Sequence, residues 1–202
     1  MTPEAQIARV KEALSLPGGA SSDFDLNPGM VLPEGRKLKA AGVLVPLLAG
    51  PAGLDVVLTK RSTRLRHHPG QVAFPGGKQD PGDATPADAA LREAEEEIGL
   101  PRGRVELIGE LPSHETVTSF VIHPVIGLID GDFTPVPEAG EVAEVFRVPL
   151  SHLADSTRFR VESRFWQGRR RAYYTVPYGP YYIWGATARI LRGLAERVAQ
   201  CA

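Results

Sequence analysis

The length, composition and charge of this chain limit what it can be. Its 202 residues are enough for one well-buried core, whereas two complete domains would be cramped. A formal net charge of −1 excludes a general nucleic-acid binder, which would need a large basic excess. The charge-free stretch 40–54 is shorter than a membrane helix and contains two prolines, so we expect no membrane partner.

The signals for redox state and targeting favour the cytoplasm. The single cysteine, Cys201, cannot form an internal disulfide, which favours a reducing compartment. The first residues include Glu4 and lack the apolar run of a signal peptide. We therefore expect a cytoplasmic protein.

Apolar periodicity and turn residues divide the chain into short elements. A helix is predicted over 3–16, because Ile7, Val10 and Leu14 recur at helical spacing, and a turn-rich arm follows over 20–38. Strands are then expected at 43–48, 54–59, 72–74, 105–111, 120–128 and 143–148, with a helix at 86–98, a hairpin of 159–166 and 171–176 across Gln167 and Gly168, and a last helix at 186–199.

This order of elements predicts an α+β fold built as α/β/α layers, in which helices flank a mixed β-sheet. Strands dominate the middle of the chain, with helices at both ends and one helix after the third strand. We expect a single domain over 1–202, with 1–38 as an N-terminal helix and arm and 40–200 as the core.

The helix at 86–98 has clear start and stop signals and an acidic face. Thr85 can cap it, Pro86 suits its first position, and Gly99 stands where helices commonly end. We expect its apolar face to pack on the sheet, and its three glutamates to project on the opposite side at i, i+3 and i+4, namely Glu93, Glu96 and Glu97. Such an oxygen cluster suits Mg²⁺ or Mn²⁺, although most glutamate runs are simply solvated surfaces.

The residues around these glutamates resemble the Nudix box, the signature of hydrolases that act on nucleoside diphosphates linked to another moiety. Gly77 opens the box and residues 92–100, REAEEEIGL, close it. The sequence departs from the usual pattern in carrying Asp83 in place of a mid-box glutamate, eight residues rather than seven before Arg92, and Ala94 in place of a larger aliphatic residue. The resemblance implies the Nudix fold and a divalent metal cofactor.

The segment from Leu58 to Asp80, LTKRSTRLRHHPGQVAFPGGKQD, resembles the extra signature of the coenzyme A diphosphatase subgroup. The insertion of one residue in the box is also typical of that subgroup. Between Lys60 and Gln79 the segment carries five cations and no acid, which suits a substrate with several phosphates. The predicted substrate-binding residues are Arg61, Arg64, Arg66, His68, Gln71 and Lys78. A second basic stretch, from Arg158 to Arg171, either helps to hold phosphate or forms the charged rim of the late hairpin, and the rim is the favoured interpretation.

The resemblance also implies roles for the box residues. Glu93 and Glu97 would be the main metal ligands, with Glu96 and the Gly76 carbonyl as further ligands, and Arg92 would orient the glutamates. The general base of such enzymes often lies outside the box, and Glu144 is the first candidate, with Glu141 as the alternative.

The expected reaction is hydrolysis of coenzyme A, or of a derivative, to 4′-phosphopantetheine and 3′,5′-ADP with Mg²⁺ or Mn²⁺ as cofactor. The partner is then a small molecule, and the protein a monomer or homodimer. One rival is another Nudix pyrophosphatase, acting on ADP-ribose or a dinucleotide. The other is a Nudix-fold protein that binds a nucleotide without hydrolysing it.

Overall fold

The computed structural model describes residues 1–30, 35–166 and 168–201, so the predicted turn residue Gln167 and part of the arm lie outside the described residues. The helices are α1 (Pro3–Ser15), α2 (Pro86–Ile98), α3 (Leu150–Leu153) and α4 (Gly185–Val198), with 3-10 turns at Arg102–Arg104 and Ser156–Arg158. The strands are β1 (Ser21–Ser22), β2 (Lys39–Gly50), β3 (Gly53–Arg61), β4 (Val72–Ala73), β5 (Gly76–Lys78), β6 (Val105–Glu110), β7 (His114–Glu115), β8 (Phe120–Ile129), β9 (Val142–Pro149), β10 (Arg160–Trp166) and β11 (Arg169–Thr175).

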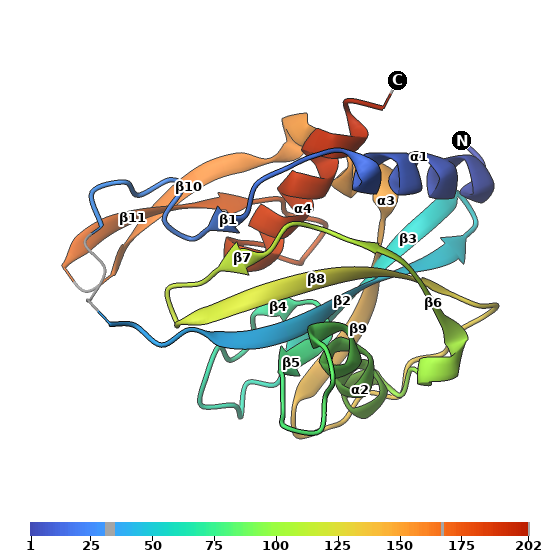
Figure 1. Ribbon diagram of the computed structural model, residues 1–202, viewed down its shortest axis with the longest axis horizontal. Helices are drawn as coiled ribbons and strands as arrows, with labels where there is room; N and C mark the ends of the chain where they lie inside the picture. The colour runs from blue at the N-terminus through green and yellow to red at the C-terminus, as the bar shows by residue number, and fades with distance from the viewer. Residues whose placement is uncertain (31–34, 167, 202) are drawn as a thin grey trace.

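A mixed sheet forms the middle layer, as predicted (Figure 1). In the described part of the chain it has nine strands, with β1-β7-β8-β2-β3-β4 as its main path. The central pair, β2 and β8, is parallel, and so is the short pair of β1 and β7, whereas the remaining pairs are antiparallel. β10 and β11 form a separate antiparallel hairpin.

Helices cover both faces of this sheet, which gives the predicted α/β/α layers (Figure 1). Side chains along β2 alternate between the two faces: Leu44 and Leu48 pack with α2, whereas Val45 and Leu47 pack with α1 and α4. The two hydrophobic clusters therefore share one sheet. In the described ranges, no helix is both long and apolar enough to cross a bilayer.

Three short strands and one short helix were not predicted. β1, β5 and β7 contain two or three residues each, which is too few for an alternating pattern, and β5 begins with two glycines that have low strand propensity. α3 is a single turn of four residues. The longer elements lie where the periodicity placed them, within a few residues at each end.

Helix α2 lies directly on β2 at Gly42, where the two backbones touch. A Cβ atom added at Gly42 would lie 1.7 Å from the Pro86 carbonyl oxygen and 2.9 Å from the Ala90 nitrogen. Both contacts are with backbone, so a side chain could be accommodated only by moving the helix. The absence of a side chain at Gly42 therefore sets how closely α2 approaches the sheet.

Replacing Gly42 with alanine is expected to destabilise the protein, because α2 must shift away from β2. We expect a loss of about 2 kcal/mol, a typical cost of overpacking, or a fall in Tm of roughly 4–8 °C for a chain of this size. Gly103 is the matched control, since a Cβ there meets no atom within 4 Å. Equal melting temperatures for the two variants in thermal denaturation would contradict this contact.

Candidate active site

The site is built on a glycine elbow in β5 that follows Phe74 and Pro75. Gly76 has a φ of +152°, and a Cβ atom there would lie 2.5 Å from the Gly42 carbonyl oxygen. A Cβ atom at Gly77 would lie 2.4 Å from Oε1 of Glu93. The position of Gly76 therefore requires glycine, and at Gly77 the absence of a side chain leaves room for the Glu93 carboxylate. The elbow thus brings the chain into contact with the glutamates of α2.

Helix α2 is held by the predicted caps. The Thr85 hydroxyl accepts a hydrogen bond from the Asp88 N–H (3.1 Å), and the Asp88 carboxylate accepts one from the Thr85 N–H (3.0 Å), which forms a capping box. At the other end Gly99 adopts the left-handed conformation with a φ of 66°. These caps fix the position of the glutamate turn along the helix.

Glu97 is buried, which corrects the prediction that all three glutamates project away from the sheet. Only 4% of the residue is exposed. The angle between Ala94 and Glu97 around a helix is only about 60°, so Glu97 lies on the flank of the apolar face. Its Oε2 accepts a hydrogen bond from the Gly76 N–H (3.1 Å), and its Oε1 lies 3.8 Å from Nη1 of Arg61.

Burial has a large effect on the two inner glutamates. It raises the pKa of Glu97 to about 7, and the charges of Glu93 and Glu141 act in the same direction. Burial also raises the pKa of Glu93, and a hydrogen bond from Arg92 partly offsets this rise. Two acidic groups thus lie close together in a place that disfavours their ionised forms.

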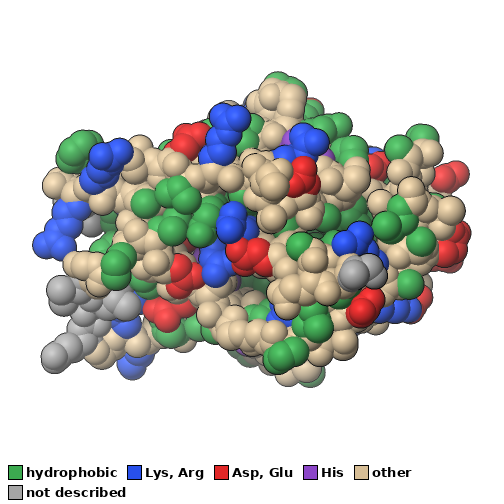
Figure 2. Space-filling view, turned by 90° about the horizontal axis from the view of Figure 1, so that it is seen from above, with side chains coloured by type: hydrophobic (Ala, Val, Ile, Leu, Met, Phe, Trp, Pro, Cys, Tyr) green, Lys and Arg blue, Asp and Glu red, His purple; other side chains and the backbone are tan. Residues whose placement is uncertain are grey.

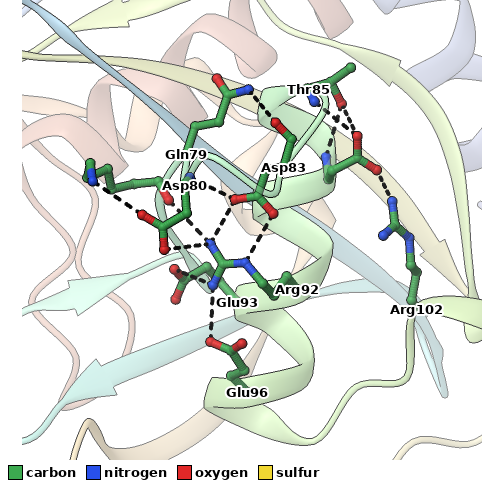
Figure 3. Close-up of polar contacts among 10 residues, drawn as sticks. Gln79, Asp80, Asp83, Thr85, Arg92, Glu93, Glu96 and Arg102 are labelled. Atoms are coloured by element: carbon green, nitrogen blue, oxygen red, sulfur yellow. Dashed lines mark hydrogen bonds and ion pairs between the residues drawn. The ribbon is translucent and has the colours of Figure 1, made fainter.

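Arg92 is the centre of the polar network around these acids (Figure 3). Its guanidinium group binds Asp83 through two hydrogen bonds, Nε to Oδ1 (3.1 Å) and Nη2 to Oδ2 (3.0 Å). Nη1 donates to Glu93 (3.0 Å) and to Glu96 (3.1 Å). The hydrogen bonds from Arg92 lower the pKa of Asp83. Asp83, the residue that departs from the usual box, therefore anchors the arginine that contacts the glutamates.

Glu96 does not join the other two glutamates. Its side chain is 60% exposed, and its carboxylate lies against Arg92 on the surface of α2 (Figure 3). Over residues 1–30, 35–166 and 168–201, no three acidic, histidine or cysteine side chains converge closely enough to form a metal site. Glu96 thus stands apart from the inner pair, and its role as a metal ligand stays a prediction.

The donor atoms of the inner pair nevertheless fit a hard divalent cation. Glu93 and Glu97 offer carboxylate oxygens beside a glycine elbow, and Mg²⁺ is commonly bound by one or two carboxylates together with phosphate oxygens. Because burial raises the pKa of both groups, a nearby positive charge would favour their ionised forms. The N–H of Gly76 points to Glu97, and the role predicted for its carbonyl stays a prediction.

A pocket of about 410 Å³ extends from the elbow along the sheet face opposite α2 to the β10–β11 hairpin and the start of α4. Of the predicted substrate-binding residues, four line it, namely Arg61, His68, Gln71 and Lys78. His68 and Gln71 are joined through Nδ1 and Oε1 (3.0 Å). Arg64 and Arg66 are exposed and lie outside the pocket lining, so their predicted roles are not supported.

The far end of the pocket was not predicted. Arg164 and Arg171 line it, which corrects their interpretation as the rim of the hairpin. They are directly opposite in the hairpin register and so leave the same face. Tyr173, Tyr174, Trp184 and Arg189 also line this end. The mixture of aromatic and basic residues in β11 was the one signal in the sequence that pointed to a binding surface here.

The two candidate bases have different surroundings. Glu144 accepts a hydrogen bond from the Tyr181 hydroxyl, and Tyr181 stacks on Phe146 at 3.6 Å. Phe146 belongs to the core beneath α4, so Glu144 faces away from α2. Glu141, in contrast, acts electrostatically on Glu93 and Glu97. Glu141 is thus within electrostatic reach of the inner glutamates, whereas Glu144 lies on the sheet face that the pocket follows and is bound by Tyr181. Neither residue lines the pocket, so the choice between them stays a prediction.

Replacing Glu97 with glutamine is expected to remove a pH-dependent loss of stability in EDTA. The folded pKa of Glu97, about 7, lies above the unfolded value of 4.5. Its protonated form therefore stabilises the protein fully below pH 4.5, and this stabilisation is lost as the pH rises through 7. Above pH 7 the variant should be more stable than the wild type by up to about 3 kcal/mol, because glutamine still accepts the Gly76 hydrogen bond.

The measurement is chemical denaturation of both proteins between pH 4.5 and 8, first in EDTA and then with Mg²⁺ or Mn²⁺. Added metal should stabilise the wild type and leave the Glu97→Gln variant unchanged. Parallel pH profiles in EDTA would contradict the assignment of the raised pKa to Glu97.

Comparison with known proteins places this site in a family. A model of the NUDIX domain matches residues 38–171. The chain is 40% identical to the uncharacterized Nudix hydrolase NudL of Citrobacter koseri and 38% identical to that of Escherichia coli K12, in each case over 88% of this chain and 92% of the relative. A MutT/nudix family protein from Enterococcus faecalis shares the fold, with a TM-score of 0.54 and 17% identity over 99% of this chain and 75% of that chain. The chain therefore belongs to the Nudix hydrolase family.

Proposed function

We propose that this chain, acting as one domain over 1–202, hydrolyses the diphosphate of coenzyme A or a derivative to 4′-phosphopantetheine and 3′,5′-ADP. The observation that carries this proposal is the pair of carboxylates, buried Glu97 and half-buried Glu93, beside the glycine elbow that lines a basic pocket. The carboxylates suit a divalent cation, and the pocket suits the phosphates that such a cation would bind.

The charge of the pocket supports a phosphate-rich substrate. Near the elbow its lining includes Arg61 and Lys78. Asp23 is the one acidic residue among the described residues that line it, and Asp23 is already paired with Arg171 at 3.0 Å. Arginine and lysine side chains are the usual protein partners of phosphate oxygens.

The choice of coenzyme A rests on the signature between Leu58 and Asp80. Its residues His68 and Gln71 are hydrogen-bonded to each other and line the pocket, beside Gly70 in a left-handed conformation with a φ of 69°. The signature thus forms a shaped wall of the pocket. This arrangement supports a role in substrate recognition, while the exposed Arg64 and Arg66 add only to the general positive field.

Glu93 and Glu97 would hold Mg²⁺ or Mn²⁺, which when bound supplies positive charge to the diphosphate and lowers the pKa of a bound water. Arg92 holds Glu93 in place through its hydrogen bond, and Asp83 holds Arg92. Arg61, beside Glu97, is placed to contact a phosphate oxygen. In the hydrolysis, water adds to one phosphorus, the bridging P–O bond breaks, and the proton of the water goes to a general base.

We assign the general base to Glu141. Its charge acts on both inner glutamates, and its carbonyl accepts a hydrogen bond from the Ser62 N–H (2.7 Å), one residue beyond Arg61. Its own N–H donates to the Glu138 carboxylate (2.8 Å), which orders the loop. Glu141 is exposed, so it can exchange protons with solvent.

Turnover of coenzyme A, dephospho-coenzyme A and ADP-ribose with Mg²⁺ or Mn²⁺ tests the proposed substrate. We expect the highest kcat/KM for coenzyme A, because the basic pocket can bind a further phosphate, and we expect 3′,5′-ADP as a product. Chromatography of the products provides the measurement. Equal or faster cleavage of ADP-ribose would support the rival Nudix activity, and binding without any cleavage would support a non-catalytic protein.

Replacing Glu141 with glutamine is expected to lower kcat by about 10²–10⁴-fold, the usual contribution of a general base. The matched control is Glu144→Gln, which removes a carboxylate three residues away and should change kcat only a few-fold. Both variants should still be stabilised by Mg²⁺, since neither residue is an inner glutamate. The reverse order of kcat losses would return the assignment to Glu144.

A further inference from the structure

The pocket has a second basic end, far from the glycine elbow, where the hairpin meets the start of α4. Arg164 of β10 lies over the ring of Trp184, with its guanidinium carbon 4.3 Å from the ring centroid. Both residues line the pocket, as do the first residues of α4. In the space-filling view from above, Lys and Arg side chains gather at the end of this face where β10 and β11 lie (Figure 2).

The arginines at this end differ in how their charge is balanced. Arg171 pairs with Asp23 (3.0 Å), a carboxylate that also accepts a hydrogen bond from the Val117 N–H (2.9 Å). Arg189 pairs with Asp25 (3.0 Å). These two arginines are therefore paired with acidic residues of the N-terminal arm, and these ion pairs connect the arm to the wall of the pocket.

Arg164 has no such partner within the described ranges. No carboxylate oxygen there lies within ion-pair distance of it, and Glu162, the acid of its own strand, accepts a hydrogen bond from the Tyr182 hydroxyl (2.6 Å). An aromatic ring attracts a guanidinium group but does not neutralise it. Arg164 thus presents to the pocket an oriented positive charge that no carboxylate of residues 1–30, 35–166 and 168–201 pairs with.

The surroundings of Arg164 favour an anionic group on a nucleotide. Tyr173 meets the Trp184 ring edge to face at 5.1 Å, so aromatic surface adjoins the charge. Helix α4 starts at Gly185 without a side-chain cap on its N–H groups, which adds a weaker positive potential. The pocket volume of about 410 Å³ falls within the range of ordinary small-molecule sites.

We propose that Arg164, held over Trp184, binds a second phosphate of the substrate, one that is remote from the diphosphate that is cleaved. For a nucleoside bisphosphate unit this is the phosphate on the ribose. The proposal rests on the proposed function, and it adds the residue by which the enzyme distinguishes a substrate with this phosphate from one without it. Arg164 would then determine substrate specificity, whereas Arg171 and Arg189, which are paired with acids, would only shape the pocket.

The kinetic test compares Arg164→Ala with Arg160→Ala, using coenzyme A and dephospho-coenzyme A as substrates. Arg160 is the matched control, because it lies on the same strand and face but outside the pocket. Losing a charge-assisted contact should raise KM for coenzyme A by about 10- to 100-fold with a nearly unchanged kcat. KM for dephospho-coenzyme A should change little, and Arg164→Lys should restore part of the discrimination.

A binding test in EDTA separates this inference from the proposed activity. Titration calorimetry should show that the wild type binds 3′,5′-ADP at least about tenfold more tightly than 5′-ADP, and that Arg164→Ala abolishes the difference. If this holds while coenzyme A is not cleaved, the subsite stands and the proposed reaction fails. If coenzyme A is cleaved but Arg164→Ala keeps the wild-type discrimination in both tests, the subsite is wrong and the reaction stands.

Discussion

The close contact between α2 and two glycine-containing strands determines the rest of the site. Gly42 lets the start of the helix touch β2, and Gly77 lies against the Glu93 carboxylate. Because no side chains separate these backbones, Glu97 enters the protein deeply enough to accept the Gly76 hydrogen bond. A helix displaced by even one methyl group would carry both inner glutamates away from the elbow. The glycines therefore set the site geometry as directly as the charged residues do.

This packing creates an electrostatic conflict that the sequence only partly offsets. Burial disfavours the ionised forms of Glu93 and Glu97. The charge of Glu93 further raises the pKa of Glu97, and the charge of Glu141 raises the pKa of both. Arg92 reaches Glu93 but is committed mainly to Asp83. Buried acids with too little positive charge around them are costly for a fold to keep. Retaining them is understandable in a site that binds a cation.

The sequence predicted the elements whose signals are local. The bounds of α2 follow from Thr85, Pro86 and Gly99, because caps act within one helical turn. The burial of Glu97 was not predicted. A helical projection places this residue at the edge of the apolar face, and it does not show that the glycine elbow covers that edge. Likewise, the sequence favoured Glu144 as the base over Glu141, although the two are only three residues apart. In the structure they differ in their neighbours, since Glu141 acts on the charges of Glu93 and Glu97 whereas Glu144 binds Tyr181.

The far end of the pocket could not be predicted, because it is assembled from segments that are distant in the sequence. Six arginines lie within residues 158–171, and the sequence alone does not show which of them face a pocket. In the hairpin register Arg164 and Arg171 are directly opposite each other and leave the same face, and both line the pocket. The N-terminal arm then distinguishes between these two, since Asp23 neutralises Arg171 and leaves Arg164 available. Specificity in such a pocket follows from the placement of acids as much as from the number of cations, and that placement is a property of the tertiary structure.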